Sequence, residues 1–497
     1  MMLNKLVLVV LAIILVGSIS AVAQHPPNCD VGCGGGTPSV GTGAGPMLTT
    51  TAFTNVRGTG NRIVAAERVG KSTAVKGSQS YTYAVNLFSL PGRNGLNLNL
   101  TLYYNSLAWE YNSDNNSMAY GGFDNPSPGF RLDYGLLQFA SDLSLGVLTE
   151  PNGAKHLFVP MSTANQFTTQ DSSYILVQYP ATSGNPAVVT YKTGMKVFYQ
   201  LFDTSFQYQY RPYQIEDTNG NIIAITYQDA NSLRINTITD TVGRVIKFTY
   251  DSATETMLQS VAQLYSSGQP FRSYYFGWAQ NQVLTFNFTK SATAGLGLPP
   301  GSLTSGQSTV NLLRQVTRPD YTSVTFDYGY GTGGNSDWGI VKSITEWSTN
   351  LSPRYQTSYV FPAASTGALT TNPTYTQQTV NDGVNTGTWN FQATTKVGTL
   401  HSPATLTCFA TLDPQNRLSV TTFSINGDVL DGLPLQETLS TISPGTSFSG
   451  CTTAIAQTWR TTNSSWTTDG AGNNPRRASM TTVLEDGTTQ SQVTFNA

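Results

Sequence analysis

Apolar and polar residues alternate along much of this chain with the period of two that β-strands require. The clearest case is Leu96-Asn-Leu98-Asn-Leu100-Thr-Leu102-Tyr103, which alternates over eight residues. The preceding segment, Pro91-Gly92-Arg93-Asn94-Gly95, has the composition of a turn. Proline and glycine recur and β-branched residues dominate the periodic stretches, so we expect no long helix after the amino-terminal segment. The pattern predicts an all-β fold.

One turn-and-strand unit occurs twice, with an offset of 23 residues. The copies are Asp217-Thr-Asn-Gly220-Asn-Ile-Ile-Ala-Ile-Thr-Tyr227 and Asp240-Thr-Val-Gly243-Arg-Val-Ile-Lys-Phe-Thr-Tyr250. Aspartate at the first turn position can accept backbone N–H bonds, and glycine at the fourth tolerates positive φ. The residues three, five and seven positions after each glycine share one strand face: Ile223, Ile225, Tyr227, Ile246, Phe248 and Tyr250.

Weaker copies extend this pattern. Pro319-Asp320-Tyr321 lacks the glycine but is followed at the same offsets by Val324, Phe326 and Tyr328. Between the two best copies, a polar turn at 228–232 leads to a second short extended run at 233–239. One repeat is therefore an antiparallel β-hairpin of about 23 residues, and stacked units of this kind cover each other's faces. Glycine-ended turns at Gly153 and Gly194 also precede predicted strands.

The amino terminus reads as an export signal. Lys5 precedes an apolar run from Leu6 to Val16, and Ala21-Val22-Ala23 matches the pattern cut by signal peptidases. We expect a signal peptide at 1–23, a mature chain from Gln24 and a Gly/Pro/Thr-rich leader or linker at 24–75. The run is too short to span a bilayer, so no membrane span is expected after cleavage.

Four cysteines in an exported chain favour disulfides over a metal site. Pairing each cysteine with its nearer partner joins Cys29 to Cys33 and Cys408 to Cys451, although three pairings are open. Zinc would need four convergent ligands, and Cys29-x-x-x-Cys33 has no matching pair or histidine cluster after it. No metal and no cofactor are predicted.

The composition limits the classes of partner that the protein can bind. Charged residues make up 11% of the chain and the net charge is −2, which gives no basic field for nucleic acid. The abundance of polar uncharged and aromatic residues is typical of an extracellular β protein. We expect a secreted or cell-surface protein, with an unidentified protein or glycan as its partner.

The repeat resembles the tyrosine-aspartate (YD) repeat of the Rhs proteins, toxin-complex C subunits and teneurins. The resemblance rests on Asp240-Thr-Val-Gly243-Arg244 through Tyr250-Asp251, and on Leu412-Asp413-Pro-Gln-Asn416-Arg417-Leu418 as a worn copy. The segments from Leu90 to Leu96, Tyr104 to Ser106 and Gly129 to Leu132 resemble the way such bacterial shells begin. The resemblance implies an exported, curled strip or partial hollow shell of antiparallel hairpins over residues 76–497.

The resemblance is incomplete at the carboxyl-terminal end. The plug segment of the toxin members, with its Asp-Pro-x-Gly-Leu signature, and their cargo domain have no counterpart in this sequence. The chain stops at Phe495-Asn-Ala497, within a predicted strand. We therefore expect a fragment, with an unpaired strand edge through which it could associate with another chain. It would serve in cell-surface binding or as the front of a toxin-enclosing shell.

No catalytic residue is predicted. The three histidines, His25, His156 and His401, belong to no H-E-x-x-H motif, and no G-x-S-x-G elbow is present. We interpret Asp217 and Asp240 as turn residues, and Tyr227 and Tyr250 as packing residues. The sequence thus predicts a non-enzymatic structural or interaction protein. The alternative is an all-β glycan-active enzyme or carbohydrate-binding protein, and an enzyme would need two carboxylates in an aromatic cleft.

Overall fold

The computed structural model describes residues 66–495, except for 70–71, 76–79, 113–116, 122–123, 141–142, 144, 170, 183, 205–207, 252–255, 289–304, 330–334, 365–372, 397–404, 426–429, 431 and 471. Strands joined by turns make up this part of the chain, with two short 3-10 segments, η1 (Arg93–Gly95) and η2 (Gly450–Thr452). The described residues contain no α-helix, so the predicted all-β class is confirmed. In the same residues, no helix has the length and apolar character needed to cross a membrane. The predicted signal peptide lies outside the described residues.

The first strands form an inner sheet with the order β1-β2-β3-β4-β7. Its strands are β1 (Ala66–Val69), β2 (Ser72–Val75), β3 (Ser80–Leu90), β4 (Leu98–Asn105) and β7 (Phe130–Arg131). β1 and β2 fall within the segment 24–75 that the sequence assigns to a leader. A separate hairpin follows β4 and consists of β5 (Trp109–Asn112) and β6 (Ser117–Tyr120). The alternation predicted before Tyr103 appears in β4, where Leu98, Leu100 and Leu102 are buried.

The next eight strands close on themselves as a barrel, because β8 pairs with β15 as well as with β9. These strands are β8 (Leu136–Phe139), β9 (Gly146–Thr149), β10 (Lys155–Pro160), β11 (Gln166–Thr169), β12 (Leu176–Gln178), β13 (Ala187–Thr190), β14 (Lys196–Asp203) and β15 (Tyr208–Glu216). The amino-terminal part of β15 pairs with β8, and its carboxyl-terminal part pairs with β16. The barrel is therefore continuous with the sheet that follows.

From β15 onward, the chain continues as a long strip of sequential antiparallel strands. The first strands are β16 (Ile222–Tyr227), β17 (Ile235–Thr239), β18 (Val245–Tyr250), β19 (Leu258–Leu264), β20 (Pro270–Asn287), β21 (Ser305–Thr317), β22 (Ser323–Asp327), β23 (Asn335–Asp337) and β24 (Ser343–Trp347). The others are β25 (Pro353–Val360), β26 (Gln377–Asn381), β27 (Thr386–Lys396), β28 (Thr405–Leu412), β29 (Arg417–Phe423), β30 (Pro434–Ile442), β31 (Ile455–Thr467), β32 (Arg476–Leu484) and β33 (Thr489–Thr494). β23 interrupts the order, since it pairs in parallel with β20 while β22 pairs directly with β24.

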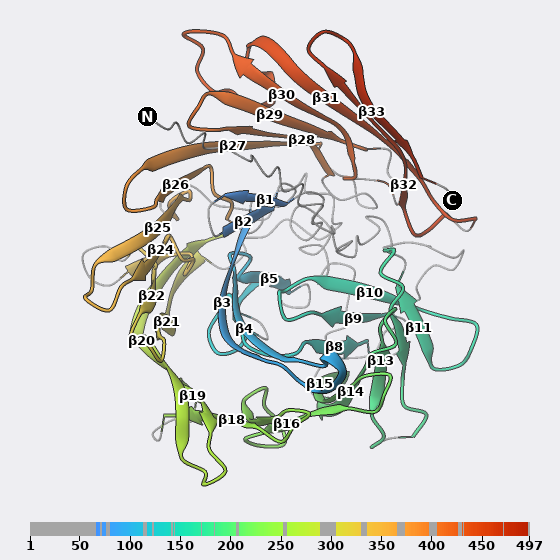
Figure 1. Cartoon of the computed structure of the whole chain (residues 1–497), viewed down its shortest axis with the longest axis vertical. Helices are drawn as coiled ribbons and strands as arrows, with labels where there is room; N and C mark the ends of the chain where they lie inside the picture. Colours follow the sequence, from blue (N-terminus) through green and yellow to red (C-terminus); the bar gives the residue numbers. More distant parts are fainter. Residues whose placement is uncertain are drawn as a thin grey trace, which may run out of the picture.

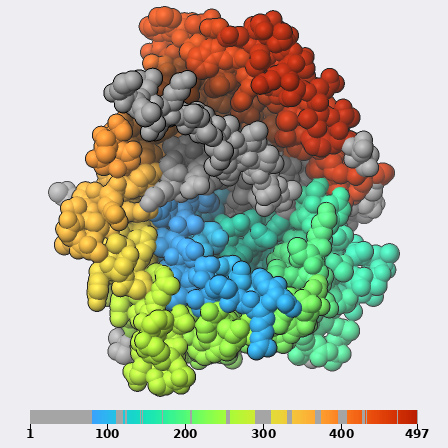
Figure 2. Space-filling view, in the orientation of Figure 1, coloured from blue at the N-terminus to red at the C-terminus, as the bar shows by residue number. Residues whose placement is uncertain are grey.

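The strip curls around the inner sheet. We call β8 to β33 the belt. Figure 1 shows the belt passing from the barrel strands through β18 and β19, then β24 to β26, and back over the molecule to β33, with β3 and β4 in the middle. In the space-filling view the inner sheet lies at the centre, with the belt on either side of it (Figure 2). The predicted curled strip of hairpins is confirmed.

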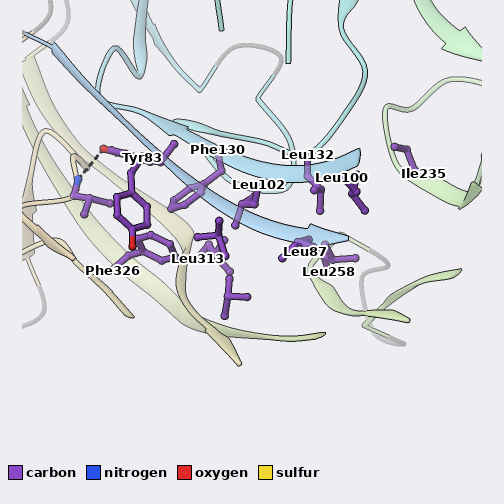
Figure 3. Close-up of a cluster of buried hydrophobic side chains, with 14 of the residues drawn as sticks. Tyr83, Leu87, Leu100, Leu102, Phe130, Leu132, Ile235, Leu258, Leu313 and Phe326 are labelled. Carbon is purple, nitrogen blue, oxygen red and sulfur yellow. Dashed lines mark hydrogen bonds between the residues drawn. The ribbon is translucent and has the colours of Figure 1, made fainter. Parts of the chain in front are cut away.

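The main core lies between the inner sheet and the belt. Tyr83, Leu87 and Leu102 of the inner sheet face Leu313 and Phe326 of the belt (Figure 3). All five side chains are buried. A separate small cluster lies within the belt and contains Ala410, Leu412 and Leu418. Burial against the inner sheet explains why the repeat strands alternate, because only one face of each meets the core.

The repeat strands lie where the sequence places them. The two best copies form β16 and β18, and the run between them forms β17. Their predicted inward residues Ile223, Ile225, Ile246 and Phe248 are buried. Both repeat tyrosines are half-buried and pack against the main core. The third copy behaves alike, with Val324, Phe326 and Tyr328 all buried.

Candidate functional site

The aspartates of the repeat organise turns. In the first copy, Asp217 Oδ1 accepts the backbone N–H groups of Asn219 at 2.8 Å and Asn221 at 2.9 Å. Asn221 Nδ2 donates to Asp217 Oδ2 at 2.8 Å. The side-chain hydrogen bond from Asn221 and these backbone bonds lower the pKa of Asp217. The carboxylate is thus held in its charged form as a turn acceptor.

The second copy uses the same geometry with a charged partner. Asp240 Oδ1 accepts the backbone N–H groups of Val242 at 3.0 Å and Arg244 at 2.8 Å, and Arg244 Nε donates to Asp240 Oδ2 at 2.6 Å. The copy at Asp413 repeats this arrangement, since Arg417 donates both its backbone N–H and its Nε to that carboxylate. All three carboxylates serve the local turn.

One pair of backbone bonds defines the turn at ten hairpins among the described residues. The first residue donates to the carbonyl of the fifth, and the fourth donates to the carbonyl of the first, which is a type I turn followed by a bulge. The first residues are Glu150, Tyr191, Asp217, Asp240, Tyr265, Arg318, Ser348, Asp413, Asp469 and Leu484. The fourth residue has positive φ in every case. Positive φ at the fourth residue is therefore a more general feature of these turns than an aspartate at the first residue.

The third copy has its turn at the position that the offsets of its strand residues indicate. Its turn begins at Arg318, and Tyr321 occupies the glycine position with a φ of 63°. Asp320 is the third residue and accepts from Thr322. Leu351 and Asn416 hold the same position in other turns, each with a φ of 60°. Residues other than glycine therefore adopt positive φ at the fourth position in three of these ten turns.

The repeat tyrosines fasten the other end of each hairpin. Tyr227 Oη donates to the Pro212 carbonyl at 2.6 Å, and Tyr250 Oη donates to the Ile235 carbonyl at 3.1 Å. Tyr328 Oη donates to a carbonyl at 2.9 Å, which also lies 15 residues earlier in the chain. Each acceptor belongs to the first strand of the same hairpin, so the hydroxyl joins the two strands at the end opposite the turn. We call this hydrogen bond, from an aromatic side chain to a carbonyl of the first strand of its hairpin, a latch.

Two tryptophans take the same role in longer hairpins. Trp278 Nε1 donates to the Leu258 carbonyl at 2.8 Å, across the β19–β20 hairpin. Trp466 Nε1 donates to the Pro434 carbonyl at 2.8 Å, across the β30–β31 hairpin. These acceptors lie 20 and 32 residues earlier, so a search for a fixed spacing misses them. The signal that could have found them is an aromatic donor at the end of a hairpin.

Removing the hydroxyl of a buried latch tyrosine will lower the unfolding free energy. Tyr328 is fully buried, and Y328F leaves the Leu313 carbonyl without this donor. We expect the variant to lose about 1–2 kcal/mol of unfolding free energy in urea titration. Y275F is the control, because Tyr275 is 57% exposed and should change stability by less than about 0.5 kcal/mol. Equal losses in the two variants would contradict the latch role.

Four aromatic side chains attach the amino-terminal strands to residues 338–341, which we call the seat. Trp109 Nε1 donates to the carbonyl of Trp338 at 2.8 Å, and the Tyr120 hydroxyl donates to the carbonyl of Gly339. Both backbone groups of Val341 are also used. Its carbonyl accepts from Tyr81 Oη, and its N–H donates to Tyr104 Oη at 2.9 Å.

The seat is buried and aromatic. Tyr81 stacks on Tyr359 with ring centroids 3.6 Å apart, and Trp338 is fully buried. Burial raises the pKa of both Tyr81 and Tyr104, so their hydroxyls remain neutral. The sequence identified none of these contacts, because they join residues more than 200 positions apart. The seat fixes the inner sheet within the belt.

A buried ionic cluster surrounds His156 of β10. Its Nδ1 lies 2.9 Å from Asp171 Oδ2, and its Nε2 lies 3.5 Å from Glu150 Oε1, an ion-pair contact longer than a normal hydrogen bond. Ser173 Oγ donates to the other Asp171 oxygen at 2.5 Å. Because this hydroxyl bonds the carboxylate and not the imidazole, the group lacks the serine–histidine contact of a nucleophilic triad. His25 and His401 lie outside the described residues.

The protonated form of His156 stabilises the fold. Burial alone lowers its pKa, but the hydrogen bond to Asp171 and the negative charges of Asp171 and Glu150 outweigh burial and raise the pKa to about 9. The folded value exceeds the ordinary value near 6.5, so this contribution is complete below about pH 6.5 and is lost as pH rises through about 9.

Because the pKa of His156 is raised in the folded protein, its contribution to stability should fall as the pH rises. We expect the difference in unfolding free energy between wild type and H156Q to shrink by on the order of 3 kcal/mol from pH 6 to pH 10. Urea titrations of both proteins at several pH values measure it. A difference that does not change with pH would show that His156 folds as the neutral imidazole.

A disulfide joins Cys408 of β28 to Cys451 of η2. Both belong to the part of the belt that contains the small cluster around Leu412 and Leu418. Cys29 and Cys33 lie outside the described residues. Within the described ranges, no group of three or more histidine, cysteine or acidic side chains is arranged to hold a metal ion.

The chain matches no protein-family model and no curated protein sequence. Its fold resembles the crystal structure of TcdB2-TccC3, with a TM-score of 0.45 and 8% sequence identity over 88% of this chain and 43% of that chain. A Photorhabdus luminescens Tc holotoxin pore has a TM-score of 0.26 and 10% identity over 88% of this chain and 22% of that one. The N-terminal domain of effector protein SpvB from Salmonella typhimurium strain LT2 has a TM-score of 0.20 and 11% identity, covering 60% of this chain and 99% of that one. The chain thus spans less than half of TcdB2-TccC3, and the likeness concerns the fold alone.

Proposed function

We propose that this chain is a non-enzymatic, exported scaffold of the YD-repeat type. Its belt holds a fixed inner sheet and presents an outer surface to a protein or glycan partner. The observation that carries the proposal is the set of latches, in which the aromatic residues of five hairpins donate to backbone carbonyls of their own hairpins. The residues that the repeat singles out are thereby used to hold the sheet together.

The electrostatics of the repeat support this assignment. A general acid in a carboxylate pair needs a raised pKa, whereas the pKa values of Asp217 and Asp320 are lowered by their turn hydrogen bonds. Asp240 is buried and paired with Arg244 at 2.6 Å. The lowered pKa values suit Asp217 and Asp320 as charged turn acceptors, and the ion pair with Arg244 suits Asp240 as a structural residue.

Export is proposed from the amino-terminal sequence. Expression of the full chain in a bacterial host followed by amino-terminal sequencing of the released protein tests it, with Gln24 as the expected first residue. Recovery of the intact amino terminus in the cytoplasmic fraction would contradict export.

A hydrolysis assay tests the non-enzymatic assignment. Mature protein beginning at Gln24 would be incubated with a panel of polysaccharides, and release of reducing ends would be measured. We expect no turnover above the blank. Turnover that disappears in E150Q or D171N would overturn the scaffold assignment, because Glu150 and Asp171 are the two carboxylates that share His156.

Carbohydrate binding is the second candidate, and exposed aromatic rings favour it. Tyr265 and Phe271 are 54% and 57% exposed, with ring centroids 4.8 Å apart, at the tip of the β19–β20 hairpin. Figure 1 shows this hairpin projecting at the lower side of the belt. Exposed rings can stack on sugar faces. A glycan array comparing wild type with Y265A/F271A, and with Y321A at another exposed turn, tests it; a signal lost only in the double variant would support binding at this tip.

A further inference from the structure

The β11–β12 connection of the barrel meets the β31–β32 connection at a small contact. The Ser172 N–H donates to Asn474 Oδ1 at 3.2 Å, and Ser172 Oγ donates to the Pro475 carbonyl at 2.8 Å. Ser172 lies in the connection after β11, whereas Asn474 and Pro475 lie just before β32. These hydrogen bonds span 302 and 303 residues of sequence. In Figure 1, the lower end of β32 comes down beside the barrel strands near β11.

Buried or charged groups hold the contact on both sides. On the barrel side, Asp171 is buried, pairs with His156 and accepts the Ser173 N–H at 3.0 Å, which fixes the bend around Ser172. On the other side, Asn474 Nδ2 donates to Asp469 Oδ2 at 2.9 Å. The carbonyl oxygen of the Asn474 amide is thereby aimed at the barrel.

The backbone on each side is in a conformation that non-glycine residues rarely adopt. The φ angles are 69° at Ser172 and 53° at Asn474. Such conformations cost free energy and persist where surrounding contacts enforce them. Contacts within each side, from Ser173 to Asp171 and from Asn474 to Asp469, hold these conformations.

Among the described residues, the last hairpins bury few side chains. β33 is exposed along its whole length, and β31 contains no buried residue. β32 contains one, Thr482. Segments that bury few apolar contacts open at lower free energy than the rest of a fold.

We propose that residues 171–173 form a clasp with Asp469, Asn474 and Pro475 that closes the belt, and that β31 to β33 act as a flap which opens when the clasp is released. The buried His156–Asp171 pair is the anchor of the clasp on the barrel side. Opening leaves β30 and β31 paired, and it separates the flap from the connection between β11 and β12. The inference goes beyond the scaffold role, since it assigns a movable part to the belt.

Trypsin cleavage reports release of the clasp, because Arg476 and Arg477 directly follow it and lie at the end of the β31–β32 ladder, which frays once the clasp is lost. The variant S172A/N474G removes both side chains of the contact, and glycine tolerates the φ of residue 474. We expect cleavage after these arginines, followed by mass spectrometry, to be roughly 10-fold faster than in wild type. D171N, which removes the anchor charge, should also accelerate cleavage there.

A matched control separates the clasp from general loosening. D486N alters the neighbouring β32–β33 turn, where Asp486 accepts the Thr488 N–H at 2.9 Å, and it should leave the rate at Arg476 and Arg477 unchanged. The clasp is overturned if S172A/N474G is cleaved there at the wild-type rate. It is equally overturned if cleavage after Arg314 in the belt accelerates by the same factor, since that would report global unfolding. Polysaccharide turnover has no part in this readout, so the result is independent of the test of the proposed function.

Discussion

Replacing Gly339 with alanine will loosen the β5–β6 hairpin from the belt and cost about 2–5 kcal/mol of unfolding free energy. Gly339 has a φ of 62°, and a Cβ there would lie 2.2 Å from Tyr120 Oη and 2.6 Å from Leu284 Cδ1. The backbone conformation costs roughly 1–2 kcal/mol with a Cβ present, and overpacking adds roughly 1–3 kcal/mol. The clash also displaces the Tyr120 hydroxyl from the Gly339 carbonyl.

Gly220 provides the matched control for this experiment. Its φ is 77°, but a Cβ there would meet nothing within 4 Å. G220A should therefore lose only the backbone term, roughly 1–2 kcal/mol. Urea titration of both variants isolates the steric part. Equal losses would mean that Gly339 is needed for its backbone conformation alone. The tight packing of Tyr120 and Leu284 against Gly339 would then be contradicted.

Removing the disulfide between Cys408 and Cys451 will have an effect of similar size. The bond closes a loop of 43 residues, for which the chain-entropy model predicts about 4 kcal/mol at 25 °C. It links β28 to η2 beside the small cluster of Ala410, Leu412 and Leu418. We expect C408A/C451A to destabilise β28 to β31 first, as seen by amide hydrogen exchange.

Mild reduction of the wild-type protein supplies the control, because it breaks the bond without changing the side-chain volume. Reduced wild type and C408A/C451A should show the same faster exchange in β28 to β31, with β16 to β18 unchanged. If the oxidised and reduced proteins exchange alike, the disulfide does not stabilise this part of the belt.

Local physical chemistry made the hairpins predictable. The spacing from Asp217 to Gly220 and Tyr227 reflects a turn, a strand face and a latch, all within one hairpin. These constraints act between residues at most 15 positions apart, so they leave a periodic pattern in the sequence. The turn at Asp413 was recognisable for the same reason, although Asn416 replaces the glycine.

Contacts set by the curvature of the belt left no such pattern. The seat joins Tyr104 to Val341, and the clasp joins Ser172 to Asn474. Neither pair can be inferred until the path of the whole strip is known. The Trp278 latch was missed for a different reason, because the long arms of its hairpin change the spacing while keeping the geometry.

The central claim is that the belt closes around an inner sheet seated on residues 338–341. The exchange rate of the Val341 amide tests it most directly, because this N–H donates to Tyr104 Oη of the inner sheet at 2.9 Å. We predict that the Val341 amide exchanges slowly in wild type and faster by at least roughly 10-fold in Y104F, with the Phe326 amide of β22 unchanged. A Val341 amide that exchanges at the rate of an unstructured peptide in the wild-type protein would contradict the seated inner sheet.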